Sequence, residues 1–374
     1  MLTNLKINNF KALRIADLKL GSINLFSGLN AVGKSSVIQS LLLLRQSFEG
    51  GGFPKGLILK NEDYVNLGLG KDVCSIGASA EERIFFELEF NYENTVNVEF
   101  NQAPNRDILP LLNFGSCVSS NFNIDEVALF TKDFQYLSAN RIKPQIQYVT
   151  SPYHVDDLKS LGKEGEYTVH FLAKNKDRPI SNKELVHSKA KSDTLLDNVN
   201  AWISDISPGV KVNATYHEEL ETASLGYSFE IASGYTQNFK PTNVGFGLTY
   251  ILPIIVGILI LPPKGLILIE NPESHLHPGG QSKIAQLCAI AANSGVQVIL
   301  ESHSDHILNG LRVAVKQNTL EHDNVHVYYF HREANSEEHE TRITEINIDR
   351  YGRADEWPKG FFDEWDNQLD ILLS

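Results

Sequence analysis

Apolar and polar residues alternate in short runs over residues 2–27, a pattern typical of β-strands. The last of these runs leads directly into a glycine-containing turn at residues 28–33. Residues 37–48 are then rich in apolar side chains over a length that predicts a helix. Because strand, glycine turn and helix follow one another without interruption, this segment has the local context that a phosphate-binding loop requires.

The middle of the chain is polar and less regular. Its glycine-rich residues 50–72 are expected to form exposed loops, and a helix is expected near residues 185–204. The remaining alternating runs predict strands, over residues 83–90, 95–100, 126–141, 210–217 and 227–233.

From residue 243 onward, helical and strand-like segments alternate. The expected order is a helix over 245–259, a strand over 265–270, a helix over 279–295, a strand over 296–302, a helix over 304–318 and a strand over 324–330. Such alternation implies parallel strands joined by crossover helices, and therefore an α/β fold with a doubly wound sheet.

Composition limits the class of protein. Of the 374 residues, 42% are hydrophobic and 21% are charged, which is ordinary for a globular protein with a sizeable core. Lys and Arg total 33 against 46 Asp and Glu, so the formal net charge is -13. This balance argues against broad binding to nucleic acid, although one local basic groove is compatible with it.

The cysteines and the apolar stretches indicate the compartment. The three cysteines (Cys74, Cys117 and Cys288) lie far apart and form no CxxC pair, as is typical of a reducing cytosol. The longest apolar stretch, residues 251–261, contains a proline and a glycine and is too short to cross a bilayer. The N-terminal residues lack the apolar core of a signal peptide. We therefore expect a cytoplasmic protein that is not in the membrane.

Residues 28–35 match the phosphate-binding pattern GxxxxGK[ST], the Walker A motif. Its glycines let successive backbone N–H groups turn toward phosphate oxygens, and the following helix directs its positive end at the anion. Lys34 would supply a charge to the β- and γ-phosphates, and the Ser35 hydroxyl would bind Mg²⁺. With ATP and Mg²⁺ as the ligands, the predicted binding residues are Gly28, Leu29, Asn30, Ala31, Val32, Gly33, Lys34, Ser35 and Ser36.

A Walker A motif needs a distant acidic residue to complete the Mg²⁺ site. Glu270 follows four apolar residues and emerges where a buried strand is expected to end, which is where ligands gather in parallel sheets. Buried strands also end in a charged residue for solubility alone. The combination with Walker A favours the metal-binding role for Glu270.

Three motifs together resemble one group of ATPases. They are the Walker A motif, the strand end with ENPESHLHP at residues 270–278, and VILESHSDHIL at residues 298–308. This combination is similar to the ABC-type ATPases of the SMC, RecF and OLD group, and to AAA_15/AAA_21-like proteins with a DUF3696 C-terminal region. Residues 347–365 resemble that region. The likeness covers residues 1–48, about 130–150, and 240–365.

The resemblance implies an ABC-ATPase-like P-loop fold with a mixed doubly wound sheet, an N-terminal antiparallel β subdomain and an inserted lobe. Residues 1–60 would form the N-terminal part of the ATPase domain with Walker A. Residues 61–240 would form the inserted β/α lobe, and residues 241–374 the C-terminal part of the ATPase domain.

In such families, a glycine-containing segment at the start of a helix contacts the γ-phosphate bound to the opposite protomer. Asn243, Gly245 and Gly247 occupy the corresponding place, although the chain lacks the sequence LSGGQ. His303 stands where the family has its switch histidine, which reports the nucleotide state. A plain helix-entry turn and a surface histidine are the respective alternatives.

Other residues have less specific assignments. His275 and His277 resemble the family's D-loop, which crosses the dimer interface; with His306 they also suggest a metal site, but a third ligand at suitable spacing is missing. Arg141 matches a recurring family position, where a structural salt bridge and a nucleotide contact both remain open.

The acidic strand end departs from the family pattern. Most relatives have two acids before the proline, whereas this chain has Glu270, Asn271 and Pro272. An asparagine can orient water but cannot accept a proton near neutral pH. Glu273 lies just beyond the turn and is an alternative base. We therefore expect slow or assembly-gated hydrolysis, with Glu270, Asn271, Glu273 and His303 as the candidate catalytic residues.

The resemblance favours a regulatory ATPase that forms a nucleotide-sandwich homodimer, or a higher homo-oligomer, and controls a separate effector, a nuclease in bacterial anti-phage defence. A single-chain OLD-like nuclease is disfavoured by the short segment after His303 and the missing DxD-type cluster. An SMC/RecF-like DNA-repair ATPase is disfavoured as a tether by the missing coiled coil. A transporter ATPase would need LSGGQ and membrane partners.

Overall fold

The structure is a computed structural model that describes residues 1–79, 81–120, 122–332 and 341–373. The chain forms two compact units, which are described separately. The first comprises Met1–Thr131, His322–Asp349 and Arg353–Ser374, and the second comprises Lys132–Glu321 and Arg350–Gly352. These limits differ from residues 60 and 240, so the division into an inserted lobe and two parts of an ATPase domain stays a prediction.

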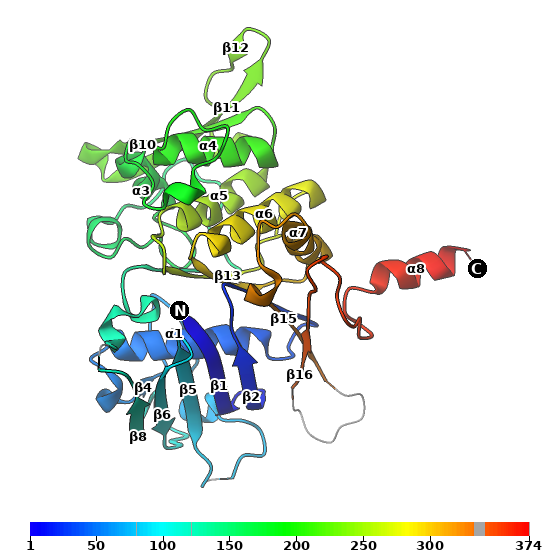
Figure 1. Ribbon diagram of the computed structural model, residues 1–374. Helices are drawn as coiled ribbons and strands as arrows, with labels where there is room; N and C mark the ends of the chain where they lie inside the picture. Colours follow the sequence, from blue (N-terminus) through cyan, green and yellow to red (C-terminus); the bar gives the residue numbers. More distant parts are fainter. Residues whose placement is uncertain (80, 121, 333–340, 374) are drawn as a thin grey trace. The chain divides into compact units, whose positions relative to one another are not determined.

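An antiparallel sheet in the first unit has the strand order β2-β1-β5-β6-β8 (Figure 1). Its strands are β1 (Leu2–Phe10), β2 (Leu13–Lys19), β5 (Ile84–Phe90), β6 (Asn94–Phe100) and β8 (Leu111–Cys117). Every second residue of β5 and β6 is buried, so one face of the sheet packs on the core. This confirms the N-terminal antiparallel β subdomain.

A second, mixed sheet in the same unit positions the Walker A motif. Strand β3 (Ile23–Gly28) is parallel to β15 (Val325–His331), which is antiparallel to β16 (Arg342–Ile346). Helix α1 (Lys34–Glu49) follows β3 after a short loop. The unit also contains α2 (Gly70–Val73), β4 (Leu57–Ile58), β7 (Ile108–Leu109) and α8 (Glu364–Leu373).

The second unit contains parallel strands in the order β14-β13-β9. They are β9 (Phe134–Leu137), β13 (Leu266–Glu270) and β14 (Gln297–Glu301), and nearly all of their residues are buried, as expected for strands covered on both faces. Helices α5 (Phe246–Leu259), α6 (Pro278–Asn293) and α7 (Asp305–Lys316) alternate with them. The predicted helix and strand alternation after residue 243 is confirmed.

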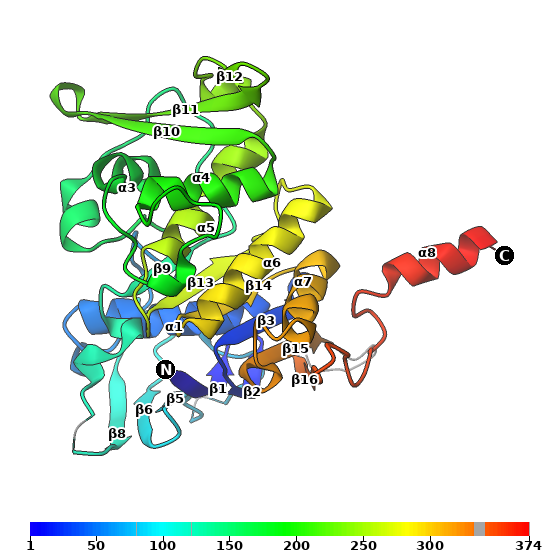
Figure 2. The same ribbon diagram turned by 45° about the horizontal axis from the view of Figure 1, so that its top comes forward.

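A separate layer of the second unit contains β10 (Val210–His217), β11 (Thr222–Ile231) and β12 (Gly234–Tyr235). Helices α3 (Thr168–Asn175) and α4 (Leu195–Ile206) pack on β10, which forms a long ribbon with β11 (Figure 2).

Helix α5 is buried all round from Thr249 to Leu259. Over the described ranges, no helix combines the length and apolarity needed to cross a membrane.

Two sequence predictions were wrong in extent. Only residues 134–137 of the strand expected over 126–141 pair with β13, and residues 128–130 form a 3₁₀ turn instead. The helix expected near 185–204 starts only at Leu195, because residues 187–194 form turns and bends held by side-chain hydrogen bonds. In one of these contacts, the Asn198 side chain accepts a hydrogen bond from the His187 N–H at 2.8 Å.

Candidate functional site

The Walker A loop has the backbone that phosphate binding needs. Gly33 precedes helix α1 with a left-handed φ of 102°, and the first turn of α1 contains no acidic side chain. The start of α1 therefore directs its positive end at an anion, with no acidic side chain in its first turn to repel it. Gly28 has a φ of 139°, and a Cβ there would lie 2.1 Å from the Phe330 carbonyl oxygen of β15. Both glycines are thus required by the backbone conformation.

Lys34 is held against the loop that it follows. Its side chain is buried, and its Nζ donates hydrogen bonds to the carbonyl oxygens of Gly28 at 2.9 Å and Leu29 at 2.5 Å. Val32 and Ser36 are also buried, whereas Leu29, Asn30 and Ala31 face solvent. The loop is therefore held by its buried residues and exposed to solvent at residues 29–31. A phosphate that binds there would meet the Lys34 ammonium group, which the loop carbonyls already position.

Two residues from the C-terminal part of the chain contact the Walker A loop, and the sequence analysis predicted neither of them. Arg332 Nη2 donates to the Ala31 carbonyl oxygen at 2.7 Å, and Thr341 Oγ1 donates to the Val32 carbonyl oxygen at 2.7 Å. A Cβ on Gly33 would lie 2.9 Å from the same Thr341 hydroxyl. No motif marks either residue, because each contributes through a contact about three hundred positions away along the chain.

In the second unit, Glu270 ends β13 with both carboxylate oxygens in hydrogen bonds. Oε1 accepts from the Tyr136 hydroxyl at 3.0 Å, and Oε2 accepts from the Ala139 N–H at 3.2 Å. Burial raises the pKa of Glu270, with these hydrogen bonds opposing the shift. A buried carboxylate of this kind is stabilised in its charged form by a divalent cation. The side chain therefore fits the predicted Mg²⁺ role.

Arg141 fixes the turn that follows Glu270. Its guanidinium is fully buried and donates to the carbonyl oxygens of Glu270 at 2.6 Å and Asn271 at 2.5 Å. It also lies over the Tyr250 ring, 4.3 Å from the ring centre, and burial lowers the pKa of Arg141 to about 10. The residue whose role the sequence left open thus contacts backbone carbonyls, and it connects the turn after Glu270 to helix α5.

Asn271 and Glu273 differ in how their side chains are used. Asn271 has a left-handed φ of 46°, its N–H donates to the Glu301 carbonyl oxygen at 2.8 Å, and its buried Oδ1 has no hydrogen-bond partner in the described part of the chain. The Glu273 carboxylate accepts from the Ser302 hydroxyl and from the His303 N–H, each at 2.8 Å. Glu273 therefore holds the loop that carries His303, whose side chain is exposed.

The two glycines of residues 243–247, the segment that leads into α5, have different surroundings. Asn243 ends a 3₁₀ turn, and Gly245 precedes α5 without a side-chain cap. A Cβ added at Gly245 would meet no heavy atom of the described residues within 4 Å. At Gly247, a Cβ would lie 2.3 Å from the His275 carbonyl oxygen. Of these two glycines, Gly245 is therefore open to an incoming group, and Gly247 serves packing inside the chain.

The histidines of the D-loop-like segment have structural contacts. The His275 ring lies against Phe246 and Tyr250, with ring centres 4.6 and 4.9 Å apart, and His277 Nδ1 accepts from the Gly279 N–H at the start of α6. Among the described residues, no group of three His, Cys, Asp or Glu side chains could hold a metal ion. The metal interpretation of His275, His277 and His306 gains no support.

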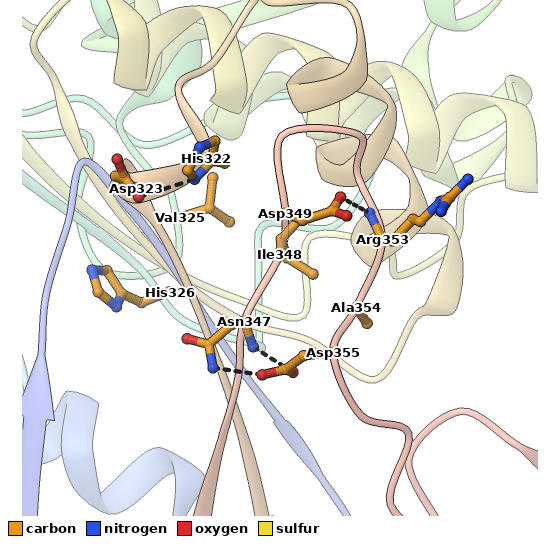
Figure 3. Close-up of a pocket in the computed structure, with 10 residues that line it drawn as sticks. All are labelled: His322, Asp323, Val325, His326, Asn347, Ile348, Asp349, Arg353, Ala354 and Asp355. Carbon is orange, nitrogen blue, oxygen red and sulfur yellow. Dashed lines mark hydrogen bonds and ion pairs between the residues drawn. The ribbon is translucent and has the colours of Figure 1, made fainter.

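A pocket of about 510 Å³ lies in the region that resembles DUF3696 (Figure 3). Its polar side chains are engaged locally. Asp355 accepts hydrogen bonds from the Asn347 N–H and side-chain amide, Asp349 accepts from the Arg353 N–H, and His322 is 3.0 Å from Asp323. These contacts fold residues 347–355 into a turn and indicate no particular ligand.

The fold, the Walker A loop and the acidic strand end at Glu270 together define an ABC-type P-loop ATPase. A family model described as "AAA domain, putative AbiEii toxin, Type IV TA system" (AAA_21) matches residues 23–309, and the chain belongs to this family. The model of DUF3696, a protein family of unknown function, matches residues 320–372. Both assignments made from the sequence are confirmed. Among curated proteins, none matches this chain.

Solved structures show the same fold at low sequence identity. One is an SmcHead bound to the C-winged helix domain of ScpA, at 10% identity and a TM-score of 0.51, covering 93% of this chain and 98% of the other. Another is the Pyrococcus furiosus Smc head domain with an extended coiled coil, bound to the C-terminal domain of ScpA. It has 9% identity and a TM-score of 0.50, covering 100% and 99%. The chain therefore has an SMC-head-like fold.

Proposed function

We propose that the protein binds ATP with Mg²⁺, that ATP joins two copies of the chain, and that the closed dimer controls a separate effector. The observation that carries the nucleotide part is Lys34, whose ammonium is held beside the Walker A carbonyls at the uncapped start of α1. Ser35 and Glu270 are the residues we assign to Mg²⁺. When bound, this ion neutralises charge on the β- and γ-phosphates.

We propose slow hydrolysis, so that ATP acts mainly as a clamp. Asn271 stands at the position of the usual base and cannot accept a proton. Both oxygens of Glu273 accept hydrogen bonds from residues 302 and 303, which makes Glu273 a positioning residue for His303. The exposed His303 side chain then has the role of a nucleotide sensor.

The proposed dimer contact is tested at Gly245. Gly245→Trp should leave ATP affinity of the monomer unchanged and remove ATP-dependent dimers, because the added ring fills the open start of α5. Light scattering with and without ATP measures the mass, and calorimetry measures the affinity. Gly247 is unsuitable, since a side chain there meets the His275 carbonyl within the same chain.

Glu219→Trp is the matched control, because Glu219 is exposed in the 3₁₀ turn that joins β10 to β11. This variant should dimerise with ATP like the unmodified chain. If Gly245→Trp also dimerises with ATP, the segment at residues 243–247 does not contact a partner's nucleotide.

The effector is proposed to be a separate nuclease in an anti-phage system. The AAA_21 description names a "putative AbiEii toxin, Type IV TA system", which favours a defence role. The solved SMC heads bound to ScpA domains provide examples of this fold with a second protein. The described residues contain no group of three His, Cys, Asp or Glu side chains that could hold a metal ion for a nuclease. The regulatory role therefore needs a catalytic partner.

The purified chain alone should not cleave DNA in the presence of ATP and either Mg²⁺ or Mn²⁺. Incubation with linear and supercoiled DNA, followed by gel electrophoresis, measures this. Cleavage by the unmodified chain that persists in Lys34→Ala would favour the single-chain nuclease instead.

A further inference from the structure

A cavity of about 310 Å³ in the second unit is separate from the residues assigned to nucleotide. It lies among a π-helix at Tyr153–Asp157, the end of α3, the start of α4 and the end of α5. Its floor is apolar, and the side chains that form it are buried: Val155, Phe171, Ile180, Leu195 and Leu259. This volume suits a ring system or a short aliphatic chain.

The rim of the cavity carries two exposed cations, Lys159 and Arg178. Neither side chain has a hydrogen bond or an ion pair with any described residue. Among the described residues that line the cavity, the acid is Asp156, which is already paired with Lys174. In a chain of net charge -13, the cavity therefore presents two uncompensated positive charges above an apolar floor.

The backbone around Lys159 is unusual. The Leu158 N–H donates to the Tyr153 carbonyl oxygen at 3.1 Å, which is the hydrogen bond of a π-helix, and Lys159 itself has a left-handed φ of 52°. Short π-helical turns occur frequently at functional sites, and a left-handed lysine carries a conformational cost. Both features therefore favour a ligand-binding role for the segment that lines the cavity.

We propose that this cavity is an effector site for a small amphipathic anion. The apolar body of the ligand would lie on the floor, and one phosphate, sulfonate or carboxylate group would contact Lys159 and Arg178. Leu259 and Ile260 line the cavity. They are the last residue and the C-cap of helix α5, which begins after Gly245. Occupancy thereby acts on the helix that we assign to dimerisation, and this regulatory step rests on the proposed function.

The binding test uses 8-anilinonaphthalene-1-sulfonate, a fluorescent aromatic anion. We expect one site per chain and an affinity about tenfold weaker in the double variant Lys159→Ala and Arg178→Ala, because two exposed ion pairs are lost. The double variant Lys183→Ala and Lys191→Ala removes equal charge from exposed residues outside the cavity, and should bind like the unmodified chain. The uncharged analogue N-phenyl-1-naphthylamine should bind more weakly than the sulfonate.

Equal affinity in the two double variants, or equal affinity for charged and uncharged probes, would overturn the site. Binding should persist in Lys34→Ala without ATP, which separates it from any failure of the nucleotide assignment. Loss of probe binding in Lys34→Ala would place the probe at the Walker A loop and contradict the proposal. An ATP-dependent dimer fraction unchanged by saturating probe would overturn the effector role.

Discussion

Lys34→Ala should weaken ATP binding by ~100-fold or more in calorimetric titrations. The substitution removes a buried ammonium group that donates to two Walker A carbonyl oxygens and is placed to meet a phosphate. Charge-assisted hydrogen bonds of this kind are about twice as strong as neutral ones, and they are made here at the start of a helix whose dipole already favours the anion. The loss should therefore exceed that of any exposed lysine.

Lys19→Ala is the control for charge, because Lys19 is exposed at the end of β2 in the same unit. Its ATP affinity should equal that of the unmodified chain. Thermal unfolding without ATP verifies that Lys34→Ala remains folded. An unchanged ATP affinity in folded Lys34→Ala would remove the basis for the nucleotide assignment.

Asn271→Glu should raise ATP turnover, on the order of 100-fold, since a positioned general base typically contributes 10²–10⁴ in rate. The Asn271 backbone is fixed by Glu301 and Arg141, so the new carboxylate would start from the same turn. The left-handed φ of 46° is less favourable for glutamate than for asparagine, which keeps the expected gain at the lower end. Steady-state phosphate release measures the change.

Glu273→Gln distinguishes a base from a positioning residue. A glutamine can still accept a hydrogen bond from the His303 N–H, so turnover should remain close to that of the unmodified chain. Glu273→Ala removes both contacts with residues 302 and 303 and should slow turnover through the displaced His303. Loss of turnover in Glu273→Gln would make Glu273 the base. Rapid turnover of the unmodified chain that stays the same in all three variants would contradict the proposal that ATP acts as a clamp.

The motifs that the sequence predicted well are local. Walker A consists of consecutive residues, and the strand before Glu270 and the helices after it follow from short apolar patterns. Arg332, Thr341 and the contacts of Arg141 could not be predicted in the same way, because their partners are distant in sequence and are backbone carbonyls, which leave no trace in side-chain chemistry. The length of β9 was misjudged for a related reason, since its partner β13 limits the pairing.

The two family regions cannot be exchanged as independent modules. Strand β15 of the DUF3696 region pairs with β3 from Ile23 to Gly28, so it completes the sheet on which Walker A is mounted. In the same region, the Gly352 carbonyl oxygen accepts from Arg312 Nε of α7 at 2.8 Å, and a Cβ on Gly352 would lie 2.4 Å from the Arg312 carbonyl oxygen. A chimera that joins residues 1–319 to the C-terminal region of a distant relative would need both contacts rebuilt. The AAA_21 and DUF3696 regions therefore have to be kept together when the protein is engineered.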